Sequence, residues 1–81
     1  MNIRVRSFAR IRELIGAEAQ TIDVPQGATI ETVWDTLSEC VPALFPLRRS
    51  LRFARNGSIV SPEVQLKDGD EVCVLPASSG G

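Results

Sequence analysis

One apolar stripe of helical period constrains this chain most, because the rest of the sequence holds only short periodic segments. The stripe recurs at i, i+3, i+4 and i+7 spacing and consists of Ile30, Val33, Trp34, Leu37 and Cys40 or Val41. Thr29 before it is a good N-cap, and Pro42 ends the pattern. We expect one main helix that faces the core, with Trp34 as its central packing residue.

Short alternating segments predict a small sheet around that helix. They are residues 2–6, 21–24, 51–55, 58–60 and 71–75. Asn56-Gly57 is a strong signal for a tight hairpin. Apolar residues at helical spacing, followed by Gly16, predict a short helix at about residues 8–15.

The order of these segments predicts an α+β fold. A mixed sheet of about five strands packed on one main helix is the β-grasp, or ubiquitin-like, arrangement, with a short extra helix after the first strand. We expect a β-grasp domain over residues 1–75 and a flexible Gly-Gly tail over residues 76–81. Between residues 42 and 50 two prolines predict an irregular connection, with Leu44, Phe45 and Leu47 covering one end of the core.

Composition excludes several classes of chemistry. The 81 residues suit a single domain, and nine Lys and Arg against ten Asp and Glu give no general attraction to nucleic acid or membranes. The chain has no histidine, so it cannot build a Ser-His-Asp triad, a Cys-His dyad or a usual zinc site. We expect no metal site, no nucleic-acid partner and no catalysis by this chain alone.

The two cysteines, Cys40 and Cys73, are not part of a C-x-x-C pair. We expect both thiols to be free, buried and inert. The N-terminus lacks the apolar segment of a signal peptide, and no stretch approaches the roughly 18 apolar residues of a membrane span. These features predict a cytoplasmic protein.

Two charged clusters have simple structural explanations. Four arginines predict a solvated basic face, with contact to an acidic protein partner as the alternative; they are Arg48, Arg49, Arg52 and Arg55. Asp68, Asp70 and Glu71 lack the spacing of a calcium loop and instead predict a tight turn.

Three apolar residues are candidates for a docking patch. Leu75 alternates with the core-facing Val72 and Val74, one of Ile59 and Val60 must point outward, and Phe8 lies where a strand meets a helix. Scattered apolar residues are also common on ordinary surfaces, so the pattern alone leaves both interpretations open.

The tail ends in Ser78, Ser79, Gly80 and Gly81. Two glycines can thread a narrow channel in another protein, and an ATP-supplying enzyme could activate the carboxylate of Gly81. The alternative explanation for these residues is a remnant of an expression vector or linker, or an ordinary frayed terminus. A Gly-Gly end that directly follows a β-grasp core favours the reactive terminus.

Two blocks resemble the small subunits of molybdopterin synthase. Residues 8–16, FARIRELIG, are similar to that family's F-A-x-x-R-E-x-x-G segment. Asn56 and residues 66–81 are similar to its L-x-D-G-D-E-V-x-x-x-P-x-x-[ST]-G-G ending. Many members have a second proline where this chain has Ala77. This departure counts slightly towards a related carrier that serves thiazole or cysteine synthesis.

The resemblance implies a ubiquitin-like sulfur carrier for molybdenum cofactor biosynthesis. A partner adenylyltransferase, similar to ubiquitin-activating enzymes, would use ATP to adenylate Gly81, and this chain would bind no cofactor. A sulfurtransferase or cysteine desulfurase system would then convert Gly81 to a thiocarboxylate. Gly80, Ser79 and Ser78 would form the tail that enters the large synthase subunit.

In the family, that large subunit supplies the catalytic side chains that pass sulfur to a pyranopterin precursor, within a heterotetramer. By the same resemblance, Phe8, Ile59 and Leu75 would fall on the apolar contact surface. Two alternatives stay open: a sulfur carrier for thiamine (thiazole) or cysteine biosynthesis, and a ubiquitin-like modifier joined to target lysines.

Overall fold

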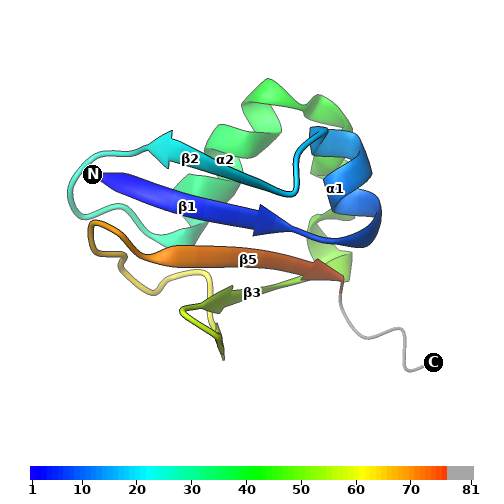
Figure 1. The fold of residues 1–81 in the computed structure, drawn as a ribbon. Coiled ribbons are helices and arrows are strands. Elements are labelled where there is room, and N and C mark those ends of the chain that lie inside the picture. Colours follow the sequence, from blue (N-terminus) through cyan, green and yellow to red (C-terminus); the bar gives the residue numbers. More distant parts are fainter. Residues whose placement is uncertain (77–81) are drawn as a thin grey trace.

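A five-stranded mixed sheet packs against one main helix in the computed structural model, which describes residues 1–76 (Figure 1). The sheet order is β2-β1-β5-β3-β4, with β1 and β5 parallel and the other neighbours antiparallel. This is the predicted α+β β-grasp architecture. No helix within residues 1–76 is long and apolar enough to cross a membrane. The elements are β1 (Asn2–Ser7), α1 (Ala9–Ile15), β2 (Ala19–Asp23), α2 (Ile30–Cys40), the 3-10 helix η1 (Pro42–Ser50), β3 (Leu51–Arg55), β4 (Ser58–Val60) and β5 (Glu71–Pro76).

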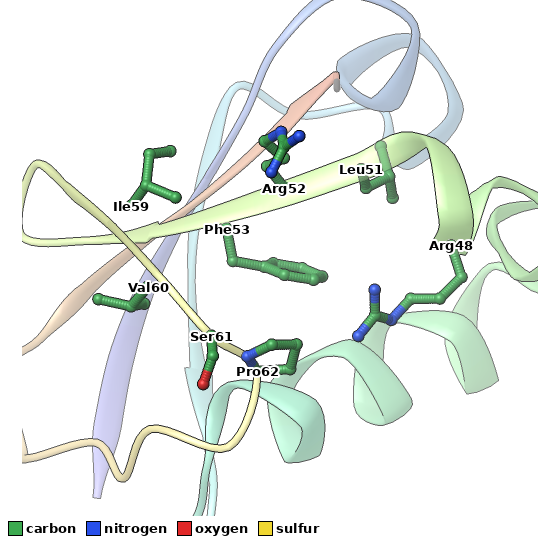
Figure 2. Close-up of a pocket in the computed structure, with 8 residues that line it drawn as sticks. All are labelled: Arg48, Leu51, Arg52, Phe53, Ile59, Val60, Ser61 and Pro62. Atoms are coloured by element: carbon green, nitrogen blue, oxygen red, sulfur yellow. The ribbon is translucent and has the colours of Figure 1, made fainter. Parts of the chain in front are cut away.

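Alternation along the strands decides which residues enter the core. Val72 and Val74 of β5 are fully buried, and Phe53 points from β3 towards α2 (Figure 2). Cys73 and Leu75 alternate with the valines and lie on the opposite face, as predicted. A slip of one residue would exchange the two faces, so burial of the valines fixes the register of β5.

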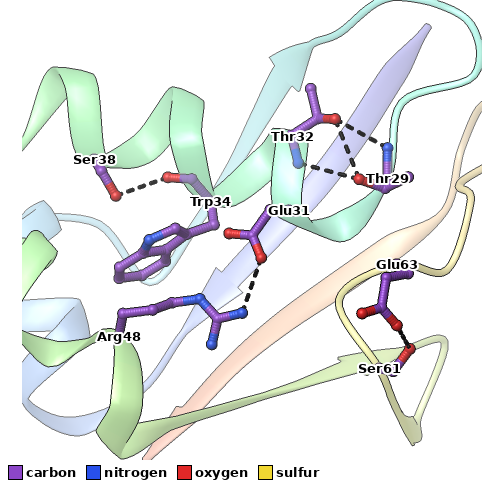
Figure 3. Close-up of polar contacts among 8 residues, drawn as sticks. All are labelled: Thr29, Glu31, Thr32, Trp34, Ser38, Arg48, Ser61 and Glu63. Atoms are coloured by element: carbon purple, nitrogen blue, oxygen red, sulfur yellow. Dashed lines mark hydrogen bonds and ion pairs between the residues drawn. The ribbon is translucent and has the colours of Figure 1, made fainter.

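Helix α2 forms where the apolar stripe predicted it. Thr29 and Thr32 make a reciprocal capping box, in which each backbone N–H donates to the other residue's hydroxyl oxygen (Figure 3). Trp34 is only 3% exposed, and its ring meets Phe53 edge to face at a centroid distance of 6.0 Å. Trp34 is therefore a central packing residue, as the sequence predicted.

The connection after α2 is more regular than expected. Residues 42–50 form η1, in which three residues per turn place Leu44 and Leu47 on one side and Phe45 off it. Leu44 is fully buried and Leu47 half-buried, whereas Phe45 is 69% exposed. The expectation that Phe45 covers the core is wrong for this reason.

The predicted burial of Cys40 is also wrong. Cys40 is the last residue of α2 and is exposed, while the next residue, Val41, packs against the core instead. Strand β5 continues through Pro76, one residue beyond the expected strand. The rest of the predicted tail, residues 77–81, lies outside the described residues, so the division of the chain at residue 75 stays a prediction.

Asp70 joins the turn before β5 to the β3–β4 hairpin. Its carboxylate accepts hydrogen bonds from the Asn56 amide at 3.0 Å and from the Lys67 backbone N–H at 2.8 Å. The Asn56 side-chain oxygen in turn accepts from the Glu71 backbone N–H at 2.9 Å. These contacts confirm the predicted turn, and the φ of 48° at Asn56 and 91° at Gly57 confirms the hairpin signal.

These contacts also set the ionisation of Asp70. Desolvation by burial raises the pKa of its carboxyl, but the hydrogen bonds from Asn56 and Lys67 and the nearby charges of Arg55 and Lys67 outweigh it. The pKa of Asp70 therefore lies below its ordinary value. The folded state thus favours the ionised carboxylate.

We expect Asp70→Asn to lower the free energy of unfolding near neutral pH by about 1–3 kcal/mol. The new amide has one oxygen, so its NH2 group would face either the Asn56 amide N–H or the Lys67 backbone N–H, and one hydrogen bond would be lost in both cases. Rotating Asn56 to avoid the first clash would break its bond with Glu71. Denaturant titrations of both proteins across pH measure the difference. A lowered folded-state pKa gives wild type an advantage that is complete above about pH 4 and disappears as the pH falls through that pKa. A pH-independent difference would contradict this assignment.

Candidate functional site

The sheet face opposite α2 carries the candidate site. Strand pairing places Cys73 between Arg6 of β1 and Ala54 of β3, and Ala54 pairs in turn with Ile59 of β4. Directly opposed residues in a sheet point to the same face, so Ile59, Ala54 and Cys73 form one row across three strands. Leu75, two residues beyond Cys73, lies on the same face.

Phe8 extends this surface at the end of β1. Ser7, the last residue of β1, is buried and pairs with Val74. Phe8 continues in an extended conformation, with φ −133° and ψ 158°, so its ring turns to the opposite face, level with Leu75 on the parallel strand. The Arg6 guanidinium lies 5.4 Å from the ring centroid of Phe8, on that outer face.

We call Phe8, Ile59 and Leu75 the outer patch. Ile59 is 59% exposed, and Phe8 and Leu75 are half-buried. The structure therefore brings together on one sheet face the three residues that the sequence singled out. Their role in partner binding stays a prediction.

The tail begins at the same end of the molecule as part of this patch. Since β5 is parallel to β1, its last residue, Pro76, lies near the end of β1 and the start of α1 (Figure 1). Ser78, Ser79, Gly80 and Gly81 lie outside the described residues. The structure does place the root of the tail, by which we mean Leu75 and Pro76.

The arginine cluster is less uniform than its sequence predicted. Arg48 is half-buried and donates to the Glu31 carboxylate at 3.0 Å (Figure 3). Its guanidinium lies 5.0 Å from the Phe53 ring centroid (Figure 2). Arg55 donates to the Gln65 backbone carbonyl at 3.1 Å. These two arginines therefore support the fold, and Arg49 and Arg52 form the exposed part of the basic face.

A shallow pocket of about 220 Å³ lies beside Arg48, between β3 and the segment after β4 (Figure 2). Phe53 is buried beneath it, and the Arg48 guanidinium is already paired with Glu31. The Ser61 hydroxyl, also on its wall, donates to the Glu63 carboxylate at 2.9 Å (Figure 3). Arg48 and Ser61 already have partners within the chain, and Arg52, the other charged residue of the wall, is exposed, so we assign no ligand to this pocket. Within residues 1–76, no group of three or more His, Cys, Asp or Glu could hold a metal ion.

Most of the chain matches a known family. The sequence model of the ThiS family matches residues 5–81. The chain belongs to the ThiS family. This places it among the carriers that the terminal Gly-Gly block predicted.

Two curated relatives and two solved structures illustrate the match. The chain is 39% identical to a molybdopterin synthase sulfur carrier subunit of Chlamydomonas reinhardtii, over 100% of both chains. It is 33% identical to one of Homo sapiens, over 98% of this chain and 93% of the other. Among solved structures it is similar to SAMP1 of Haloferax volcanii, with a TM-score of 0.84 and 26% identity over 100% of both chains. A chain in the complex of subunits 1 and 2 of the Helicobacter pylori molybdopterin-converting factor gives a TM-score of 0.72 and 26% identity, again over 100% of both chains.

These similarities confirm the predicted fold and family. Two neighbours of the outer patch were not predicted from the sequence. They are Arg6, which lies over the Phe8 ring, and Arg52, which pairs with Leu75. Strict alternation in β1 could have placed Arg6 on the outer face. The position of Arg52 depends on the pairing of β3 with β5, which no local pattern reveals.

The two cysteine thiols have different surroundings, and Cys73 lies on the outer sheet face. Burial raises the pKa of the Cys73 thiol, and the Glu71 carboxylate raises it further, against an opposing effect of Arg6. Cys73 is therefore protonated at neutral pH. It is half-buried and not fully buried as predicted, whereas Cys40 is exposed.

We expect a maleimide or iodoacetamide reagent at neutral pH to modify Cys40 faster than Cys73, by about tenfold or more. Time-resolved mass spectrometry of the wild type measures both rates, and Cys40→Ser isolates the slower thiol. Equal rates at the two positions would show that Cys73 is neither shielded nor held protonated by its surroundings.

Proposed function

We propose that this chain carries sulfur on Gly81 as the small subunit of a molybdopterin synthase. The family resemblance of residues 8–16 and 66–81 implied a sulfur carrier function in molybdenum cofactor biosynthesis. Relatives named molybdopterin synthase sulfur carrier subunit, at 32–39% identity, confirm it. The observation that carries the finer proposal is the match of residues 5–81, which includes Gly80 and Gly81. The described β-grasp core, ending at Pro76, supports it by leading directly into this Gly-Gly end.

The chemistry proposed for Gly81 explains why the chain needs no catalytic side chains. A free carboxylate is a poor electrophile. Attack of its oxygen on the α-phosphorus of ATP releases pyrophosphate and makes an acyl-adenylate, whose AMP is a good leaving group. The outer sulfur of a persulfide donor then displaces AMP and forms an acyl disulfide. A thiol reduces the S–S bond of this acyl disulfide, which leaves the thiocarboxylate on Gly81 and a disulfide between the donor sulfur and the thiol. The adenylyltransferase and the sulfur donor system supply these steps, and this chain supplies the acyl group.

The outer patch is the proposed docking surface for the large synthase subunit. Phe8, Ile59 and Leu75 lie on the uncovered sheet face, and Leu75 directly precedes Pro76, the last described residue. A subunit that covers this face would bury apolar surface and hold the root of the tail at the same time. The related Helicobacter pylori protein is solved as a complex of subunits 1 and 2.

Incubation with the adenylyltransferase, ATP and a sulfur donor should replace one oxygen of Gly81 by sulfur. Intact-mass measurement followed by C-terminal peptide mapping detects the exchange. Removing Gly81, or adding one residue after it, should abolish the exchange and leave the thermal unfolding midpoint unchanged. If sulfur fails to appear on Gly81 of the wild type under these conditions, the proposed carrier chemistry is wrong.

The outer patch is tested by Ile59→Asp, with Phe45→Asp as its matched control. Both residues are exposed and apolar, but Phe45 lies on η1, away from the outer sheet face. Burying a carboxylate in an apolar interface should weaken binding of the large subunit by about tenfold or more for Ile59→Asp and leave Phe45→Asp close to wild type. Calorimetry measures both dissociation constants, and equal values would remove Ile59 from the interface.

A second candidate function is that of a ubiquitin-like modifier. The similarity to the structure named SAMP1, which is that of a small archaeal modifier protein, favours it. Modification would form an isopeptide bond between Gly81 and target lysines, and the same activated terminus could serve both roles. Tryptic mass spectrometry of cell extracts distinguishes this function by lysines that bear residues 68–81, the peptide that cleavage after Lys67 would leave on a target. Sulfur transfer leaves no such adduct.

A further inference from the structure

A second apolar surface lies at the root of the tail, on the other side of β5 from the outer patch. It is a pocket of about 170 Å³ between α1, η1 and the end of β5. Its floor is formed by Ile11 and Leu51, which are buried, and its rim includes Ala9 and Pro76, which are exposed. Apolar cavities of about 150 Å³ are large enough to hold a benzene ring, so this pocket has room for one aliphatic or aromatic side chain.

Strand alternation separates this pocket from the outer patch. Leu75 points to the outer face, whereas Pro76 pairs with Leu51 and lines the pocket. The two apolar surfaces therefore flank the last residues of β5 from opposite sides. An enzyme that holds Gly81 must bind within about 18 Å of Pro76, because the five residues after Pro76 reach no farther when extended. The pocket, whose wall includes Pro76, lies within that range.

The rim carries features that suit a protein partner. Arg10 lines the pocket and is exposed, and within residues 1–76 no carboxylate lies within 4.0 Å of its guanidinium. Ala9 has φ 52°, a left-handed conformation that is uncommon for a residue with a side chain. Such backbone strain clusters at ligand-contact sites, and here it lies on the rim beside Arg10.

We propose that this pocket receives an apolar side chain of the large synthase subunit, next to a carboxylate of that subunit that pairs with Arg10. The inference rests on the proposed function and adds a second contact to it. With the outer patch on one side and this pocket on the other, the large subunit holds the root of the tail between two contacts. That arrangement fixes the direction in which the tail leaves the sheet and so the position of Gly81.

Filling the pocket tests the apolar contact. Ser50 is exposed and lies on the rim, so Ser50→Phe can cover the pocket without entering the core. Ala43→Phe adds a similar ring to an exposed position of the same 3-10 helix, outside the pocket. We expect Ser50→Phe to weaken binding of the large subunit by about tenfold or more, and Ala43→Phe to bind within about twofold of wild type.

Charge reversal tests the ion pair separately. Arg10→Glu should slow association with the large subunit several-fold and reduce its dependence on salt, because the pair would become repulsive. Lys67→Glu makes the same change of charge in the turn before β5, at the other end of that strand, and should associate like wild type. Stopped-flow measurements at low and high salt give both rates.

The outcomes separate this inference from the proposed function. If wild type acquires sulfur on Gly81 and binds the large subunit, but Ser50→Phe and Arg10→Glu both bind like wild type, the pocket contact is wrong and the carrier function stands. If wild type acquires no sulfur and does not bind the large subunit, both proposals are wrong. Weaker binding by Ser50→Phe, with unchanged sulfur loading at Gly81, supports the pocket contact.

Discussion

The packing of α2 against one face of the sheet is the interaction on which the rest of this structure depends. Trp34 of the helix meets Phe53 of the sheet edge to face, and the buried valines of β5 lie in the same core. Successive side chains of a strand point to opposite faces of the sheet, so the neighbours of each core residue lie on the face away from α2. The uncovered face, with Ile59 and Leu75, is thus a direct product of how the core is built.

Much of the fold could be predicted because its signals are local. The apolar stripe of α2 and its Thr29 cap lie within one segment, and Asn56-Gly57 encodes a hairpin without reference to the rest of the chain. Alternation alone placed Leu75 on the outer face. The terminal block and the FARIRELIG segment carried the family, which the match to the ThiS family confirms.

The features that escaped prediction depend either on the type of helix that a segment forms or on residues far apart in the chain. Phe45 was expected in the core, but the three-residue turn of η1 directs it to solvent, and no local hydropathy pattern distinguishes it from Leu44. The pocket at the root of the tail combines α1, η1 and β5, whose meeting depends on the complete sheet order. Individual positions such as Arg10 become interpretable only once that order is known.

The parallel pairing of β1 with β5 affects whether two partner enzymes can bind this chain at the same time. It gathers Phe8, Leu75 and the root of the tail at one end of the molecule. Under the proposed function, the adenylyltransferase and the large synthase subunit both require that end, so they exclude one another. The carrier must leave one enzyme before it meets the next, and the lifetime of each complex then limits how fast sulfur can move through the system.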